Sequence, residues 1–90
     1  MFEWDKNMYK NNDLLNNLDK IHSTELGIER IKKNLNINPY NVIEWCRGKI
    51  NKADNISRIG KNWYVHAGDS IFTVNAHSFT IITAHRKKDG

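Results

Sequence analysis

The stretch that decides the fold runs from Gly60 to Lys88 and reads GKNWYVHAGDSIFTVNAHSFTIITAHRKK. In its first part apolar residues alternate with polar ones, and the apolar positions are Trp63, Val65 and Ala67. Such alternation predicts a half-buried strand. Gly68-Asp69 then predicts a turn, and residues 71–76 and 79–85 are rich in the β-branched and aromatic side chains that favour strands. The stretch therefore predicts a three-stranded antiparallel meander.

Three helical patterns precede this stretch. Apolar residues recur at three- and four-residue spacings from Asp13 to Ile21, from Thr24 to about Asn36, and again up to Ile50, which places them on one face of each helix. Asn38-Pro39 supplies a capping residue followed by proline at the first position of the third helix. We therefore expect an α+β protein in which about three N-terminal helices pack on one face of the sheet.

The length and the pattern along the chain predict a simple domain organisation. Ninety residues make one small domain. Aromatic residues near the start stand among polar neighbours without a clear period, so we expect residues 1–12 to form an N-terminal arm. Residues 13–90 are then expected to form a single α+β domain.

The composition excludes several classes of protein. It is 39% hydrophobic and 27% charged, as in ordinary globular proteins. No apolar run approaches the roughly 20 residues that span a bilayer, and the start lacks the apolar stretch of a signal peptide. We therefore expect a cytoplasmic protein without a membrane segment. Cys46 is the only cysteine, and the histidine spacing does not suit a metal, so we expect no metal site and no cofactor.

Charge is distributed unevenly along the chain. Residues 1–29 hold three Lys and six acidic residues, a net charge of −3, and the rest holds eleven Lys or Arg and four acidic residues, a net charge of +7. A basic field favours polyanions, RNA above all, or an acidic protein partner, although many domains are basic for solubility alone. The candidate binding residues are Arg30, Arg58, Lys61, Tyr64, Arg86 and Lys87.

A second set of residues indicates possible chemistry. If the side of the third strand that bears Ile82 and Ala84 is buried, then Thr83 and His85 lie together on the open face. Tyr64 and His66 can join them there from the first strand. We therefore take His85, His66 and Thr83 as catalytic candidates. Metal-independent RNA cleavage needs a base for the 2′-hydroxyl, an acid for the leaving oxygen and stabilisation of the phosphorane. The alternative is that these residues are solvated positions at strand ends.

Four segments resemble one family. They are TELGIERIKKNL (Thr24 to Leu35), GKNWYV (Gly60 to Val65), TVNA (Thr73 to Ala76) and TIITAH (Thr80 to His85). Together they resemble the small bacterial family known as domain of unknown function 3781, over roughly residues 13–87. This resemblance implies no particular activity. The ending TVNAHSFTIITAH is also similar to the last hairpin of RelE-type, colicin-type and barnase-like toxin nucleases, with His85 where such toxins often carry an aromatic residue.

Three classes of function stay open for a small bacterial or phage protein of this kind. The first is an RNA-directed protein, for example a metal-independent toxin-type ribonuclease. The second is a non-catalytic module that binds nucleic acid or an acidic protein, such as a phage-encoded inhibitor of a bacterial defence nuclease. The third is a homo-oligomeric domain, for instance a homodimer. We expect binding of RNA or of an acidic partner rather than chemistry.

Overall fold

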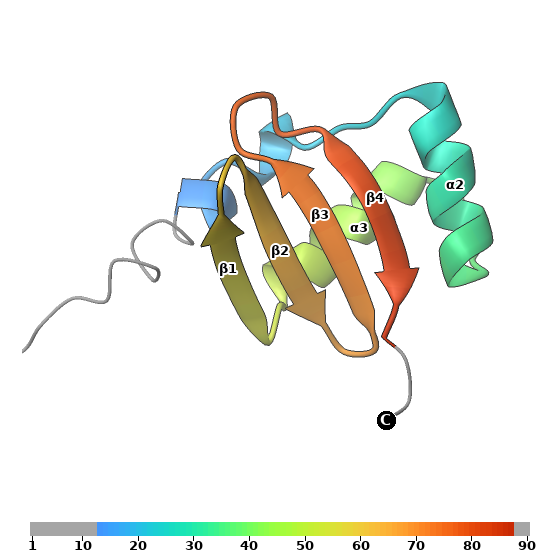
Figure 1. Ribbon diagram of the computed structural model, residues 1–90. Helices are drawn as coiled ribbons and strands as arrows, with labels where there is room; N and C mark the ends of the chain where they lie inside the picture. The colour runs from blue at the N-terminus through green and yellow to red at the C-terminus, as the bar shows by residue number, and fades with distance from the viewer. Residues whose placement is uncertain (1–12, 88–90) are drawn as a thin grey trace, which may run out of the picture.

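The computed structural model describes residues 13–87. Its elements, in chain order, are the 3-10 helix η1 (Leu18–Lys20), the helices α2 (Glu25–Leu35) and α3 (Val42–Asn51), and the strands β1 (Asn55–Ile59), β2 (Asn62–Ala67), β3 (Ser70–Asn75) and β4 (Ile81–Arg86) (Figure 1). Residues 13–15 add a short helical turn ahead of η1. The α+β class is confirmed. The N-terminal arm expected over residues 1–12 lies outside the described residues.

The sheet is a four-stranded antiparallel meander in the order β1-β2-β3-β4 (Figure 1). The expectation of three strands was therefore wrong, and the strand it missed is β1. Of the five residues of β1, only Ile56 is buried. An edge strand with one buried residue lacks the regular apolar alternation from which a strand is predicted.

Two tight turns set the register of the first three strands. Gly60-Lys61 joins β1 to β2, Gly68-Asp69 joins β2 to β3, and both glycines have a φ of +61°. A two-residue hairpin turn with a left-handed first residue matches the twist of the strands and favours glycine there. A Cβ atom at either glycine would meet no atom within 4 Å, so it is the backbone conformation that requires glycine.

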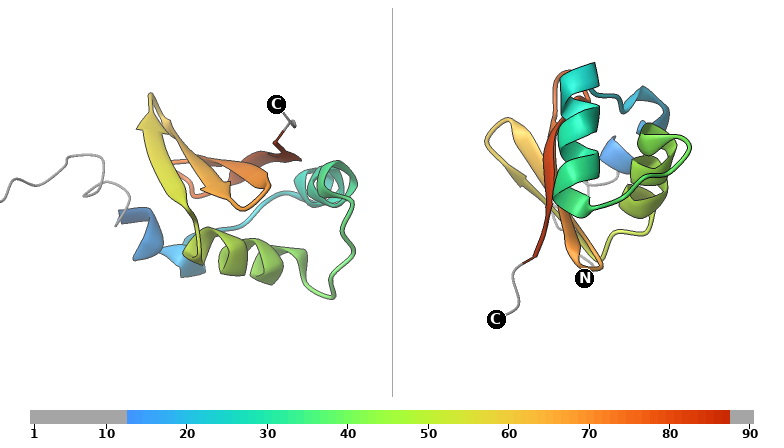
Figure 2. Two further views of the ribbon diagram at one scale, coloured as in Figure 1. Left: turned by 90° about the horizontal axis from the view of Figure 1, so that it is seen from below. Right: turned by 90° about the vertical axis from the view of Figure 1, so that its right-hand side faces the viewer.

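The two long helices occupy different places around the sheet. Helix α3 lies across one face, and α2 runs beside β4 at the edge (Figure 2). The expectation that the helices pack on one face therefore holds for α3 and is wrong for α2. The reason is a set of polar contacts along β4: the Ser23 hydroxyl donates to the Ile81 carbonyl at 3.0 Å, and the Asn34 amide donates to the Ala84 carbonyl at 3.1 Å.

The ends of the helices follow local capping chemistry. The Thr24 hydroxyl accepts the Gly27 N–H at 2.9 Å, and Asn36, in the left-handed conformation, caps the end of α2. The sequence predicted that this helix ends near Asn36. Helix α3 begins at Val42, because Asn41 accepts the Glu44 N–H at 3.1 Å; the predicted start at Asn38-Pro39 was wrong. A cap is set by the side chain that satisfies the first free N–H groups, and here that side chain is Asn41.

The hydrophobic core lies between the sheet and the helices. Its fully buried members with the largest side chains are Trp63, Phe72, Leu14, Ile21, Ile31, Leu35, Ile50 and Ile81. Burial of this apolar surface is the main stabilising contribution to the fold. Among the described residues, no helix has the length and apolar character needed to cross a membrane.

Candidate functional site

The face of the sheet opposite α3 carries the sequence-predicted candidates, and we call it the open face. Figure 1 is viewed onto it, with α3 behind. On β2 the buried residues alternate with half-buried ones, and the register carries this alternation across the sheet. The open face consists of Asn55, Ser57, Ile59, Asn62, Tyr64, His66, Ile71, Thr73, Asn75, Thr83 and His85.

The register arranges most of these side chains in two rows across the four strands. The first row runs Ser57, Tyr64, Thr73, Thr83, and the second runs Asn55, His66, Ile71, His85. Directly opposite residues of neighbouring strands have side chains close enough to interact. The structure therefore brings four of the predicted site residues onto one face, namely Tyr64, His66, Thr83 and His85.

A bulge decides which side chains of β4 reach the open face. Val74 pairs with Ile81 and Thr73 pairs with Thr83, so Ile82 is an extra residue in β4. An extra residue breaks the alternation of a strand, and Ile81 and Ala84 are both buried while Ile82 is 46% exposed. Thr83 and His85 therefore face outward, as expected if Ala84 is buried, although Ile82 is not buried with it.

The two histidines of the open face stand apart. His66 and His85 are both opposite Ile71, one on each side of β3. Two strand spacings put their backbones roughly 10 Å from each other. Within residues 13–87 no hydrogen bond joins the side chains of His66, His85 and Thr83 to one another. The three catalytic candidates thus share a face without forming a hydrogen-bonded group.

Charge around the open face is one-sided. The four strands contain no Asp or Glu. Lys61 lies in the β1–β2 turn and Lys87 follows β4, and the strand directions place these residues at opposite ends of the sheet. Within residues 13–87, the two carboxylates that flank the strands in sequence are both engaged: Asp54 accepts the Gly68 N–H at 2.8 Å, and Asp69 pairs with Arg86.

The three predicted arginines lie elsewhere. Arg86 donates to Asp69 and to the Leu35 carbonyl, both at 2.6 Å, so it joins the β2–β3 turn to the end of α2. Arg58 donates to the Gly60 carbonyl at 2.9 Å, and its guanidinium lies 5.6 Å from the centre of the Trp63 ring. Arg30 is exposed on α2, away from the sheet face.

A polar cluster that sequence reasoning missed lies at the start of β4. His22 Nδ1 is 2.8 Å from the Lys20 carbonyl, and Nε2 is 3.1 Å from the Thr80 hydroxyl, which is 2.7 Å from Ser78 Oγ. A carbonyl only accepts, so Nδ1 is the donor in the contact with Lys20. His22 and Thr80 are 58 residues apart, and no local pattern signals such a contact.

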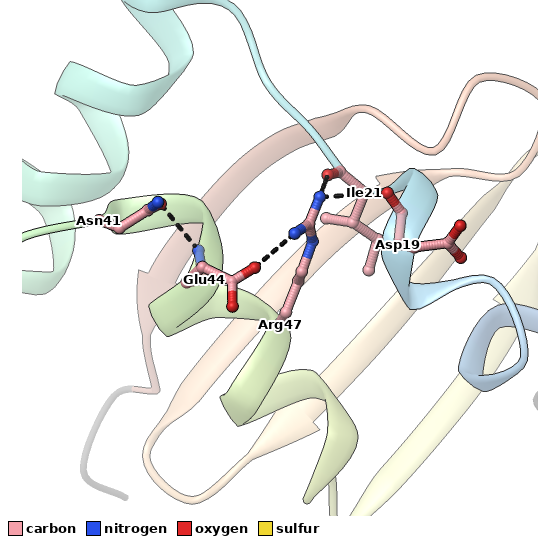
Figure 3. A network of polar contacts seen from close by, with 5 residues as sticks. All are labelled: Asp19, Ile21, Asn41, Glu44 and Arg47. Atoms are coloured by element: carbon pink, nitrogen blue, oxygen red, sulfur yellow. Dashed lines mark hydrogen bonds and ion pairs between the residues drawn. The ribbon is translucent and has the colours of Figure 1, made fainter.

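A second network fixes α3 (Figure 3). Arg47 donates to the carbonyls of Asp19 and Ile21, at 3.1 and 2.9 Å, and pairs with Glu44 one turn earlier in the helix. These contacts tie α3 to the segment that contains η1. Helical periodicity shows that Arg47 lies beside the apolar stripe, but it does not show which backbone the side chain reaches.

Neither a metal site nor a reactive thiol emerges from the described part of the chain. Residues 13–87 contain no group of three or more His, Cys, Asp or Glu side chains that could hold a metal ion. Cys46 is buried, and its removal from water raises the pKa of the thiol to about 12. A thiol in such surroundings stays protonated near neutral pH and is a poor nucleophile.

These features define a small α+β protein whose antiparallel meander is covered on one face and open on the other. The model of the family described as "Protein of unknown function (DUF3781)" matches residues 15–85, and the chain belongs to this family. Searches of curated proteins and of solved structures found no match. The likeness of the last hairpin to toxin nucleases therefore has no support from these comparisons.

Proposed function

We propose that this protein binds single-stranded RNA on the open face. The observation that carries the proposal is the composition of that face: the rings of Tyr64, His66 and His85 stand among hydroxyl and amide side chains, on strands without a carboxylate. Unpaired bases stack on such rings, and their edges are read by hydrogen bonds.

The spacing of the rings suits several nucleotides. Tyr64 and His66 are two residues apart on β2, roughly 6.6 Å, and His85 is two strands further on. Each ring therefore offers a separate platform rather than one shared stack. Stacking of a base on an aromatic side chain contributes about 1–3 kcal/mol, so the three rings together favour a short unpaired segment.

Phosphate contacts come from the two ends of the sheet. Lys61 and Lys87 stand at opposite ends, and a six-residue strand is roughly 20 Å long. A single strand of RNA that lies along the sheet can therefore contact one lysine at each end. Two phosphate contacts predict that affinity falls about sevenfold between 50 and 200 mM salt.

Binding is favoured over cleavage by the residue between the two histidines. Ile71 is opposite both His66 and His85. Cleavage requires a cation or a hydrogen-bond donor aimed at the charge that develops on phosphorus, and an isoleucine side chain supplies neither. The open face thus has the groups for stacking and lacks, between its histidines, the group for transition-state stabilisation.

The test is fluorescence anisotropy with a labelled single-stranded RNA of mixed sequence, in EDTA at 50 mM salt. Tyr64→Ala is expected to weaken binding roughly 5- to 150-fold, the equivalent of one lost stacking contact. The matched control is Tyr40→Ala, because Tyr40 is fully exposed in the connection before α3; its affinity should equal that of the wild type.

Three results would contradict the proposal. The first is no binding at 50 mM salt, which would direct the search to acidic protein partners. The second is an equal loss in the Tyr40 and Tyr64 variants. The third is RNA cleavage that disappears in His66→Ala or His85→Ala while the fold is kept, which would identify a metal-independent ribonuclease instead.

A further inference from the structure

The two edges of the sheet are treated differently by the fold. The outer edge of β4 is covered by polar contacts from Ser23 and Asn34 to the carbonyls of Ile81 and Ala84. Along β1, by contrast, no strand within residues 13–87 pairs with the outer edge. An unpaired edge presents N–H and C=O groups to any strand that can match them.

The turn shows which groups of β1 point outward. In a two-residue hairpin the residues that flank the turn, here Ile59 and Asn62, form a hydrogen-bonded pair, and such pairs alternate along an antiparallel ladder. Asn55, Ser57 and Ile59 therefore bond to β2. The N–H and C=O groups of Ile56 and Arg58 face away from the sheet.

β1 lacks the usual protection of an edge strand. It contains no proline and no lysine, the residues that commonly block edge pairing. Its one charge, Arg58, is turned toward the Gly60 carbonyl and the Trp63 ring, which is away from the middle of the strand. Ile59, at the end of β1, is 64% exposed.

We propose that two copies of this chain pair their β1 strands antiparallel, about a twofold axis at Ser57. In this register Ile56 of one copy is opposite Arg58 of the partner subunit, and Ser57 is opposite its own equivalent. The strand is self-complementary, because its two outward-facing positions are two residues apart and exchange four backbone hydrogen bonds across the axis.

Pairing at this edge continues the open face. The two meanders become one eight-stranded sheet, and the row that contains Tyr64 and Ser57 runs on into the same row of the partner. Because the axis is perpendicular to the sheet, both open faces look the same way. The pairing stands on the geometry of β1 alone, whereas its consequence, a doubled surface for RNA, rests on the proposed function.

The size of the contact predicts a weak dimer. Two five-residue edges bury little surface. Transient complexes typically bury less than about 1,200 Å², and this contact falls in that class. We therefore expect a monomer–dimer equilibrium that shifts with protein concentration. Sedimentation velocity of the wild-type chain without RNA, over a hundredfold range of concentrations, measures it directly.

Charge at residue 57 tests the position of the axis. Ser57→Lys and Ser57→Glu are each expected to sediment as monomers, because like charges stand directly opposite each other. An equimolar mixture of the two variants should form a dimer again, since opposite charges then meet at the axis. A mixture that stays monomeric, while the wild type dimerises, would place the interface elsewhere and overturn the proposal.

Disulfide trapping gives an independent test. Directly opposite residues of a non-hydrogen-bonded pair have Cα atoms about 4.5 Å apart, within the range for a disulfide. Ser57→Cys is therefore expected to form a covalent dimer on mild oxidation, whereas Ser78→Cys, at an exposed serine of the β3–β4 connection, should stay monomeric. The native Cys46 is buried and does not compete.

Equal trapping of the two cysteine variants, or a wild-type chain that is monomeric at every concentration, would overturn the pairing. The RNA assay separates this failure from that of the proposed function. A monomer that binds RNA through Tyr64 would contradict the pairing and support the proposed function. A dimer that does not bind RNA would support the pairing and contradict the proposed function.

Discussion

The two faces of the sheet come from the same strands and differ in almost every property. On β2, Trp63, Val65 and Ala67 are at most 2% exposed beneath α3, while Asn62, Tyr64 and His66 between them are half-buried on the open face. Successive side chains along a strand point to opposite faces of the sheet. One strand thus supplies apolar surface to the core and ring side chains to the candidate site, and neighbouring residues can be changed to separate stability from binding.

The largest expected effect comes from the middle of the covered face. Trp63→Ala should lower the free energy of unfolding by about 3–5 kcal/mol, because the cavity it leaves is fully buried. Trp63→Phe should lose much less, since the indole N–H has no hydrogen-bond partner among the described residues. Urea unfolding measures both variants. Tyr64→Ala should change this free energy by less than about 1 kcal/mol; an equal loss at Tyr64 would erase the contrast between the faces.

The second effect concerns the helix that covers the inner face. Arg47→Ala removes the guanidinium that donates hydrogen bonds to the backbone carbonyls of Asp19 and Ile21. This substitution should lower the free energy of unfolding by about 2 kcal/mol. Arg47→Lys keeps the charge but cannot span both carbonyls and Glu44, so an intermediate loss is expected. RNA affinity should be the same in both folded variants. An alanine variant as stable as the wild type would mean that this network contributes nothing to the position of α3.

A third, smaller effect separates two neighbouring cations at the end of β4. Arg86→Ala should lower the free energy of unfolding by about 1 kcal/mol, a modest value because the pair with Asp69 is half exposed. Lys87→Ala should leave this free energy unchanged and reduce the salt dependence of RNA binding by a slope of about 0.7. Thermal unfolding and anisotropy at several salt concentrations measure the pair. If Arg86→Ala instead lowered the salt dependence of RNA binding and Lys87→Ala lowered the stability, the phosphate contact would belong to Arg86 and not to Lys87.

Sequence patterns predicted the elements whose signals are local. Helix α2, with Thr24 as its cap and Asn36 at its end, has a regular apolar stripe, and β2 has regular alternation. Strand β1 and the start of α3 were missed. For β1 the cause is a single buried residue, and for α3 it is a choice between two asparagines, each of which can cap a helix.

The candidate site could be predicted only in part, because its geometry depends on register. Alternation along β2 places Tyr64 and His66 on one face without further information. The bulge at Ile82 reverses the alternation within β4, and nothing in the sequence FTIITAH marks the extra residue. Arg86 donates to the carbonyl of Leu35, 51 residues away, and composition does not show such a contact.

The smallest effect lies at Cys46, on the covered side. Burial raises the pKa of this thiol from 9.0 to about 12, so the folded chain holds its proton more tightly than the unfolded chain. The stability linked to this group is complete below pH 9 and is lost as the pH rises toward 12. We compare the free energy of unfolding of the wild type with that of Cys46→Ala. Between pH 7 and pH 9.5 this difference should shift by roughly 0.8 kcal/mol against the wild type.

Urea unfolding of the wild type and of Cys46→Ala at pH 7 and pH 9.5 measures this shift. The titration of all other groups is common to the two proteins, so it cancels in the difference. An aromatic disulfide reagent at pH 8 should react with Cys46 only after unfolding, because the thiol is inaccessible in the folded chain. Fast reaction of the folded protein would show that α3 separates readily from the sheet and exposes Cys46. The covered face would then be as accessible as the open one, and burial could no longer account for the difference between them.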